Sequence, residues 1–311
     1  MNIVLTIRDK IPVKKYGGTE RVVVWLADAL AKKGHTVFIA APAGSTSASA
    51  TVIGLKPRTC ARFPLPAGID MVHHHALPVF EAAAPSLLTY HWITGDRYYP
   101  FPSNTVFLSK AHAAMYGQTR FVHNGLDPSE YLFREQKDDY FLFLARVSRS
   151  SKGVDRAIAL AKRMGFRLVI AGGYKFSLSR KIRSVGMVGG REKAELIAGA
   201  RALLFPVSWP EPFGLAVIEA LCSGTPVITS PCGAMPEIVT PDTGFICDGQ
   251  PAMEAAVERL GEISPHACRR RVLENFTADI MADHYLKEYR QVIAQATSTG
   301  AAYPPAKASL P

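Results

Sequence analysis

The chain has 311 residues, of which 48% are apolar and 20% are charged. This length suits two ordinary domains that each bury their own core, and no uncharged run is long enough to span a bilayer. The net charge of +10 allows nucleic acid, an anionic membrane surface or phosphorylated small molecules as partners. Nucleic acid is disfavoured, because neither zinc-finger spacing nor a Gly/aromatic strand signature accompanies the basic residues.

The N-terminus and the cysteines indicate a reducing compartment. The sequence enters an apolar, β-branched run within its first residues, without the basic, apolar and small-residue pattern of a signal peptide. The five cysteines form no Cys-x-x-Cys pair and cannot all pair within one chain. We therefore expect a cytoplasmic protein with reduced thiols.

Short β-branched runs alternate with helical patterns in the first part of the chain. A strand, a helix closed by Gly34 and a second strand form a βαβ unit, which is typical of a doubly wound parallel sheet. The elements expected here are strands at 3–7, 36–41, 71–74, 87–90, 105–108 and 120–122, and a helix at 20–33.

A second α/β series begins after the charged patch at 134–139. The sequence thus predicts two Rossmann-like domains facing a cleft: 1–132, 133–278, a C-terminal helix at 279–297 that crosses back to the first domain, and a disordered tail at 298–311. Strands are expected at 140–144, 166–171, 202–206 and 226–230, with helices at 154–164, 191–198, from about 213, 252–263 and 279–296.

Two carboxylates lie eight positions apart in the apolar run from Trp209 to Glu219. Pro210 and Pro212 hold Glu211 in an extended turn, so a helix should begin near Phe213 and Gly214. The first amides of that helix form an anion site, which Gly214 lets a ligand approach closely. Glu219 follows about 12 Å along the axis, and a carboxylate binds a vicinal diol well. An isolated pair would more often be solvated, but the Pro-Glu-Pro-Phe-Gly context favours a sugar–diphosphate–ribose ligand.

Basic and glycine residues follow the expected strands. Arg146 ends a strand and Lys152 opens the next helix, which suits a diphosphate, although such cations are common in a basic protein. Gly17 and Gly18 lie between the first strand and the first helix, where no Gly-x-Gly-x-x-Gly fingerprint of NAD binding occurs.

Histidines also follow two strands of the first half. Residues 73–75 are three consecutive histidines, but alternate side chains of a strand point to opposite faces, so they cannot all bind one ion. No spaced His/Asp/Glu set completes a metal site, and we expect no metal. His91 at a strand end has the chemistry of a sugar-facing hydrogen-bonding residue.

Five segments in this order carry a resemblance to a known family. They are 16–23 (YGGTERVV), 122–127 (VHNGLD), 211–215 (EPFGL) with Glu219, 224–228 (GTPVI) and 233–238 (GAMPEI). Together they resemble the family 4 retaining glycosyltransferases of the GT-B architecture, and the likeness covers most of the chain.

The resemblance implies metal-independent transfer of a sugar from a nucleotide-diphosphate sugar to a hydroxyl acceptor, with retention and without a protein nucleophile. It implies the following contacts to the donor: Glu211 and the amides of Phe213, Gly214 and Leu215 at the sugar and phosphate, Glu219 at the ribose diol, Arg146 and Lys152 at the diphosphate, Gly17 and Gly18 over the phosphates, and His91 at the sugar. The chain contains no Asp-x-Asp, as this family implies.

Two departures leave alternatives open. The usual Gly-Arg is Ala145-Arg146 here and the gap to Lys152 is one residue longer, so Arg149 competes as the phosphate ligand. The alternative functions are a nucleotide-sugar-binding protein without transfer activity and a nucleotide-sugar 2-epimerase. The basic segment containing Lys10, Lys14 and Lys15 suggests peripheral contact with a membrane or an anionic acceptor.

Overall fold

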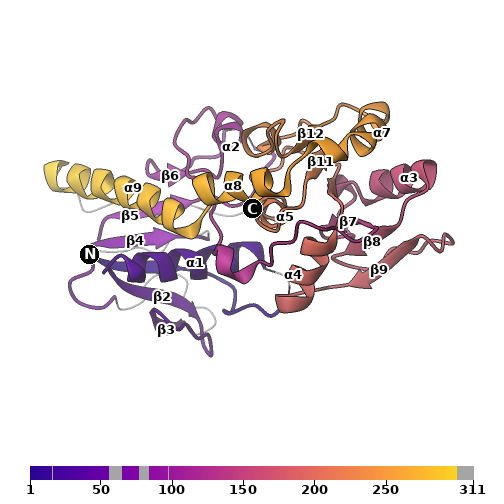
Figure 1. Cartoon of the computed structure of the whole chain (residues 1–311). Coiled ribbons are helices and arrows are strands. Elements are labelled where there is room, and N and C mark those ends of the chain that lie inside the picture. The colour runs from indigo at the N-terminus through magenta and orange to yellow at the C-terminus, as the bar shows by residue number, and fades with distance from the viewer. Residues whose placement is uncertain (16, 56–64, 77–83, 97, 300–311) are drawn as a thin grey trace. The chain divides into compact units, whose positions relative to one another are not determined.

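The computed structural model describes residues 1–15, 17–55, 65–76, 84–96 and 98–299 (Figure 1). Within these residues the chain forms two α/β units. Unit 1 contains Met1–Val13, Gly17–Gly125 and the chain from Ala278, and unit 2 contains Lys14, Lys15 and Leu126–Thr277.

Unit 1 is built on a parallel sheet with the strand order β3-β2-β1-β4-β5-β6. Its strands are β1 (Asn2–Thr6), β2 (Thr36–Pro42), β3 (Thr51–Leu55), β4 (Met71–His74), β5 (Ser86–Thr89) and β6 (Thr105–Val106), and its helices are α1 (Gly18–Lys32), α2 (Lys110–Ala114) and α9 (Ala278–Thr299).

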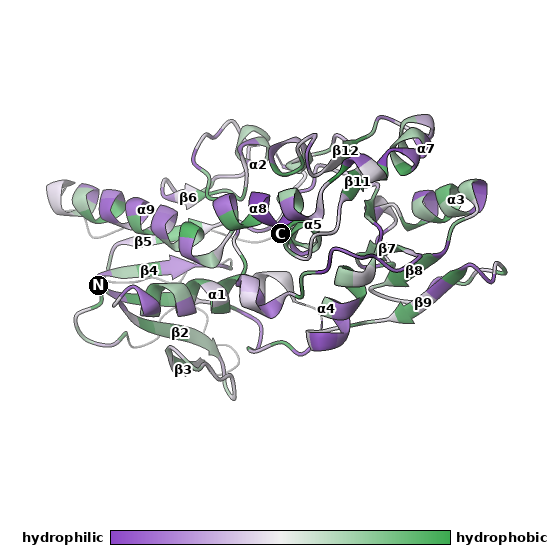
Figure 2. Cartoon of the chain, viewed as in Figure 1, coloured by the Kyte–Doolittle hydropathy of each residue, from purple (hydrophilic) through white to green (hydrophobic). Residues whose placement is uncertain are grey.

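Helices α1 and α9 pack against each other in unit 1, and α9 also contacts β5. The buried face of α1 includes Val22, Leu26 and Leu30, which follow the helical spacing of four residues. In Figure 2 both helices carry mixed stripes, whereas β2 is mainly in the hydrophobic colour and β4 is partly hydrophilic because it contains His73 and His74. The helix α9 thus belongs to unit 1, although it follows unit 2 in the sequence.

Unit 2 is built on another parallel sheet, with the order β12-β11-β10-β7-β8-β9. Its strands are β7 (Phe141–Leu144), β8 (Leu168–Ala171), β9 (Ile182–Gly186), β10 (Leu203–Phe205), β11 (Val227–Thr229) and β12 (Gly244–Ile246). Its helices are α3 (Val154–Met164), α4 (Gly190–Gly199), α5 (Leu215–Cys222), α6 (Met235–Ile238), α7 (Gln250–Glu258), α8 (Pro265–Asn275) and the single 3₁₀ turns η1 (Pro128–Glu130), η2 (Ser150–Lys152) and η3 (Leu260–Glu262).

The two parallel sheets confirm the predicted fold class. Six elements were missed: the strands β3, β9 and β12 and the helices α2, α6 and α8. The three strands lie at sheet edges and contain polar or glycine residues, so their apolar signal is weak. The expected strand at 120–122 is wrong, since it forms only an isolated bridge between Phe107 and Phe121.

The change from unit 1 to unit 2 comes earlier than the predicted boundary at 132/133. The amide of Leu126 donates to the carbonyl of Phe276 (3.0 Å), and Leu126 forms an isolated bridge with Thr277. Residues from Leu126 onward therefore belong to unit 2, and the chain returns to unit 1 at Ala278 rather than at 279.

The C-terminal part of the chain begins as the helix α9, which includes residues 298 and 299 of the expected tail. The rest of that tail lies outside the described residues. Over the part of the chain that the structure describes, no helix combines the length and the apolar character needed to cross a membrane.

Candidate functional site

Glu211 lies in the loop that precedes α5, and its side chain is almost fully buried. The residue is 8% exposed. Its carboxylate oxygen Oε2 accepts a hydrogen bond from the indole N–H of Trp209 (2.8 Å) and forms an ion pair with the ammonium of Lys152. That ammonium also lies 4.6 Å from the centre of the Trp209 ring. Both contacts fall on Oε2, so the turn predicted from Pro-Glu-Pro holds the carboxylate in one orientation.

Two glycines allow the backbone around Glu211 to close tightly. Gly214 caps the N-terminus of α5 with φ +96°, a left-handed conformation that favours glycine. Gly233 has φ +61°, and a Cβ there would lie 2.2 Å from the backbone oxygen of Glu211. That same oxygen accepts a hydrogen bond from the amide of Ala234 (2.9 Å). The close fit fixes the loop beside the N-terminus of α5.

Phe213, Gly214 and Leu215, which were predicted to bind the donor, lie at the N-terminus of α5. Phe213 is a core residue whose ring packs edge-on against Phe276, with 5.9 Å between the ring centres, while Leu215 is half-buried. Only their backbone amides are suited to a ligand, because the first amides of a helix have no partner within it. The partial positive charge of this end suits an anion.

Glu219 is buried on α5 and is only 6% exposed. Its Oε1 accepts hydrogen bonds from the Tyr131 hydroxyl (2.8 Å) and the Lys193 ammonium (2.6 Å). Lys193 lies on α4, and its ammonium is 5.7 Å from the centre of the Tyr131 ring. The carboxylate is therefore held by a cation and a hydroxyl from two other segments.

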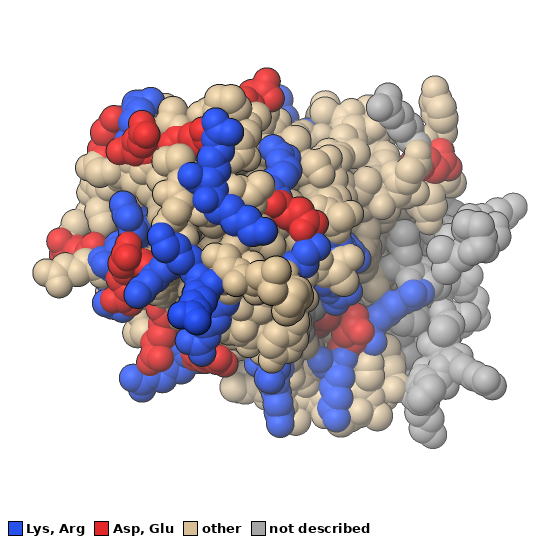
Figure 3. Space-filling model, turned by 90° about the vertical axis from the view of Figure 1, so that its right-hand side faces the viewer, with Lys and Arg blue, Asp and Glu red and all other residues tan. Residues whose placement is uncertain are grey.

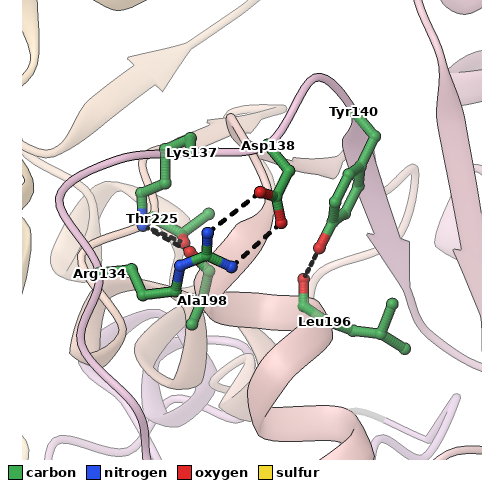
Figure 4. A network of polar contacts seen from close by, with 7 residues as sticks. All are labelled: Arg134, Lys137, Asp138, Tyr140, Leu196, Ala198 and Thr225. Atoms are coloured by element: carbon green, nitrogen blue, oxygen red, sulfur yellow. Dashed lines mark hydrogen bonds and ion pairs between the residues drawn. The ribbon is translucent and has the colours of Figure 1, made fainter.

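Lys137 joins the C-terminal ends of the two helices that carry this ion pair (Figure 4). Its ammonium donates to the carbonyls of Ala198 at the end of α4 (2.9 Å) and Ser223 after α5 (3.1 Å), and to the hydroxyl of Thr225 (3.1 Å). A cation is favourable at helix C-termini. Burial lowers the pKa of Lys137 to about 8.

The neighbouring carbonyls of α4 also have partners. Tyr140 donates to the carbonyl of Leu196 (2.8 Å; Figure 4). Thr225 donates to the carbonyl of Ile197 (2.7 Å). The carbonyls of Leu196, Ile197 and Ala198 in the last turn of α4 thus all accept hydrogen bonds. These bonds hold the end of the helix in place and with it Lys193, one turn earlier.

The cations expected at the end of β7 differ in exposure. Arg146 is half-buried and its carbonyl accepts the amide of Arg149 (3.1 Å), whereas the Arg149 side chain is exposed. Lys152 ends η2 and is the cation that meets Glu211. The backbone at Ala145 runs so close to Gly172 that a Cβ at Gly172 would lie 2.1 Å from the Ala145 carbonyl oxygen.

In unit 1, α1 begins at Gly18, two residues before the expected start at Glu20. Gly17 is the N-cap with φ 152°, and a Cβ there would lie 2.8 Å from the Val13 side chain. Burial raises the pKa of Glu20 in the first turn.

His91 follows β5 and contacts another histidine. Its Nε2 lies 2.9 Å from Nδ1 of His75, which follows the neighbouring strand β4. Burial, and then the charge of His112, lower the pKa of His91 to about 3. His91 is therefore a neutral imidazole near pH 7, able to donate or accept a hydrogen bond but not to act as a cation.

The consecutive histidines point to alternate faces, as the strand argument requires. His73 and His75 share a face with ring centres 4.0 Å apart, while Nδ1 of His74 meets the Thr6 hydroxyl (3.1 Å). His73 connects β4 to α9 through Tyr289 (2.7 Å). Among the described residues no cluster of three or more His, Cys, Asp or Glu side chains is arranged to hold a metal.

Lys193, Tyr131 and Trp209 were not predicted as neighbours of the Glu211 and Glu219 carboxylates. Lys193 had a detectable signal, because it occupies the same helical face as the buried Ala194 and Ile197. A lysine on an apolar face needs a buried partner. Tyr131 is 88 residues from Glu219 in sequence and had no such signal.

The unit 2 sequence matches a known family. Residues 129–273 match the family model described as glycosyl transferases group 1. The matched region is a little less than half of the chain. It contains Arg146, Lys152, Glu211 and Glu219, and so both lysine–glutamate pairs.

Curated relatives match about half of this chain or less. An uncharacterized glycosyltransferase of Methanocaldococcus jannaschii is 27% identical over 39% of this chain and 38% of its own length. A glycogen synthase of Mycobacterium tuberculosis is 30% identical over 48% of this chain and 41% of its own. A GDP-mannose-dependent phosphatidylinositol dimannoside mannosyltransferase of M. tuberculosis is 35% identical over 41% of this chain and 36% of its own. The chain thus spans about two fifths of the length of these relatives.

Solved structures match almost the whole chain and establish the fold. A glycosyltransferase involved in avilamycin A biosynthesis has a TM-score of 0.77 at 24% identity, covering 94% of this chain and 98% of its own. Sucrose-phosphate synthase from Thermosynechococcus elongatus has a TM-score of 0.74 at 19% identity, with 94% and 99% covered. The chain has the two-domain GT-B fold.

Proposed function

We propose that this chain is a retaining, metal-independent glycosyltransferase that moves a sugar from a nucleotide-diphosphate sugar to a hydroxyl acceptor. The observation that carries the proposal is the pair of buried carboxylates, Glu211 before α5 and Glu219 on it, each paired with a lysine. Burying two charged pairs is costly for stability alone. The group 1 family match over the same residues supports a catalytic reason for keeping them.

The donor nucleotide would lie along α5 in this proposal. Glu219 binds the ribose diol, and the amides of Phe213, Gly214 and Leu215 face the phosphate. Glu211 binds sugar hydroxyls through Oε1, since Trp209 and Lys152 already occupy Oε2. The sugar end and the ribose end of the donor are thus recognised by separate carboxylates.

The remaining predicted residues serve the leaving group and the sugar. Lys152 and Arg146, with the helix amides, stabilise the charge that develops on the departing diphosphate. Gly17 and Gly18 close over the phosphates. His91 donates or accepts a hydrogen bond at the donor sugar as a neutral imidazole, because its pKa of about 3 leaves it uncharged.

The nucleotides used by similar proteins support this donor class. One relative is a GDP-mannose-dependent mannosyltransferase. An Anabaena protein of the same fold (TM-score 0.70, 15% identity) was solved in complex with UDP and glucose. The nucleobases of these two proteins differ, so we propose the donor class and not one base.

We also propose that the protein works in a reducing compartment such as the cytoplasm. Four described cysteines carry free thiols, and burial raises the pKa of Cys222 and Cys247 to about 11 and that of Cys268 to about 12. Thiols held protonated in this way react slowly with oxidants.

The test is incubation with UDP-, GDP-, ADP- and TDP-sugars in EDTA, with an excess of a simple alcohol as the hydroxyl acceptor and product analysis by NMR. We expect release of one nucleoside diphosphate and a glycoside of unchanged anomeric configuration, and loss of both in Glu211→Gln. An inverted product would contradict the retaining mechanism. Unchanged donor would point to a binding protein, and donor altered at C2 would point to an epimerase.

A further inference from the structure

The loop between β8 and β9 carries a row of exposed apolar side chains. We call residues 172–181 the β8–β9 loop; it joins β8 to β9, which is an edge strand of the unit 2 sheet (Figure 1). Tyr174, Phe176 and Leu178 are 79%, 85% and 89% exposed. Single exposed apolar residues are common, but three large ones at alternate positions of one loop are not.

Hydrogen bonds within the loop and to β9 hold its backbone in this arrangement. The Ser184 hydroxyl accepts from the amide of Lys175 (3.1 Å) and donates to the carbonyl of Lys175 (3.0 Å). The Ser177 hydroxyl accepts from the amide of Ser179 (3.2 Å), whose carbonyl accepts from the amide of Ile182 (3.1 Å). The polar residues of the loop face these bonds, which directs the alternate apolar residues to solvent.

The same region is basic. Arg180 and Lys181 in the loop and Arg183 on β9 are exposed. The Lys181 ammonium donates to the carbonyl of Gly165, and Lys175 forms an ion pair with Asp155 (2.7 Å). Figure 3 shows the side of the molecule on which the loop lies, where Lys and Arg side chains gather. Basic residues beside exposed aromatic and aliphatic residues are typical of segments that bind an anionic lipid surface.

A second copy of this chain fits the loop less well than a bilayer. Three side chains bury on the order of 500 Å², below the roughly 800 Å² per partner of a stable protein interface. Two such loops, each with several cations, would also repel. A bilayer needs no matching surface, since Tyr and Phe partition to the lipid–water interface while arginine and lysine stay at the headgroups.

We propose that the β8–β9 loop docks this protein on an anionic phospholipid bilayer, with Phe176 and Leu178 entering the interface and Arg180, Lys181 and Arg183 at the headgroups. This loop shares no residue with the candidate donor site or with the basic segment of Lys10, Lys14 and Lys15. It is independent of the proposed function, because it concerns where the protein works and not what it transfers.

Flotation of the full chain with phosphatidylcholine vesicles, with and without phosphatidylglycerol, tests this surface. The wild type should bind only the vesicles that contain phosphatidylglycerol. Phe176→Ser/Leu178→Ser should weaken binding by at least about tenfold, because apolar burial at the interface is lost. Tyr98→Ser is the matched control, since Tyr98 is 94% exposed on unit 1, and it should bind as the wild type does.

A charge pair of variants separates the two basic segments. Arg180→Glu/Lys181→Glu should abolish binding to phosphatidylglycerol vesicles, whereas Lys14→Glu/Lys15→Glu, which changes two other exposed lysines, should leave it unchanged. Circular dichroism confirms that each variant is folded.

Three results would overturn the proposal. They are wild-type binding to no vesicle, equal binding by the Phe176→Ser/Leu178→Ser variant, and loss of binding only in Lys14→Glu/Lys15→Glu. A wild-type dimer in sedimentation that becomes a monomer in the loop variant, with vesicle binding unaffected, would assign the surface to a second copy instead.

Discussion

Removal of the Lys193 ammonium should loosen α4 and α5 strongly. In Lys193→Met, Glu219 keeps its bond from Tyr131 but loses its cation. The lysine and glutamate side chains are 10% and 7% exposed. Removing one partner of a buried ion pair costs about 3–5 kcal/mol, and the bond from Tyr131 places this case near about 3 kcal/mol.

Amide hydrogen exchange of the α4 and α5 peptides measures this effect locally. A loss of about 3 kcal/mol corresponds to exchange about 150-fold faster in amides that exchange by opening of these helices. Arg191→Met is the matched control, because Arg191 is on the same helix and pairs with Glu195 (2.7 Å), but its side chain is 88% exposed. An exposed helix pair contributes little to stability, so exchange should rise only about twofold.

Equal effects of Lys193→Met and Arg191→Met would refute the reasoning, because burial would then add nothing to the Lys193–Glu219 pair. The double variant Lys193→Met/Glu219→Gln gives a second check. It leaves no unpaired charge, so its cost should be at least about 1 kcal/mol smaller than the sum of the two single costs.

Three further changes test other parts of the account. Tyr131→Phe removes one hydrogen bond to Glu219 but keeps the ring, so donor affinity by calorimetry should fall by roughly 2- to 10-fold; unchanged affinity would show that this hydroxyl does not orient the carboxylate. Gly233→Ala places a Cβ 2.2 Å from the backbone of Glu211 at φ +61°, so the melting temperature should drop by several degrees, whereas Gly261→Ala, with no atom within 4 Å, serves as the mild control. Acidification from about pH 7 to about pH 5 should lower the free energy of unfolding of unit 1, measured in urea. Histidines of the unfolded chain bind protons below about pH 6.5 whereas the buried imidazoles stay neutral, so each can lower this free energy by up to about 1.4 kcal/mol per pH unit. A free energy of unfolding that does not change with pH would contradict the lowered pKa values of His73, His74 and His75.

The sequence predicted elements best where local signals agreed. The helix Val154–Met164 was predicted with its observed bounds, because Gly153 and Gly165 flank it with φ +85° and +72° and the apolar spacing is helical. Strand β4 was also predicted with its bounds. Edge strands β3 and β9 were missed because their polar residues hide the alternation that marks a half-buried strand.

The roles of basic residues were harder to predict than the fold. In the basic cluster at 269–271, Arg269 donates to the carbonyl of Cys222 (2.7 Å) and Arg271 to that of Glu237 (2.8 Å). Both carbonyls lie at helix ends, where cations are favourable. Such contacts join residues more than 30 positions apart, so no local pattern reveals them.

The pairing of the candidate site residues was not predicted. The Pro-Glu-Pro-Phe-Gly context indicated a ligand-binding turn, and the structure holds that turn beside the α5 N-terminus. The sequence assigned Lys152 to a diphosphate, whereas the structure pairs it with Glu211. That pairing depends on the close packing of two loops 59 residues apart, which only the folded unit defines. The contacts to a donor stay predictions.

The most direct test of the donor site is thermal stabilisation by UDP, GDP, ADP and TDP in EDTA, on the wild type and on Glu219→Gln. A ligand that binds the folded state raises its stability. The account predicts a clear rise in melting temperature with one nucleotide, and its loss in Glu219→Gln. No rise with any nucleotide, or a rise of equal size in the variant, would contradict a nucleotide site built on Glu219.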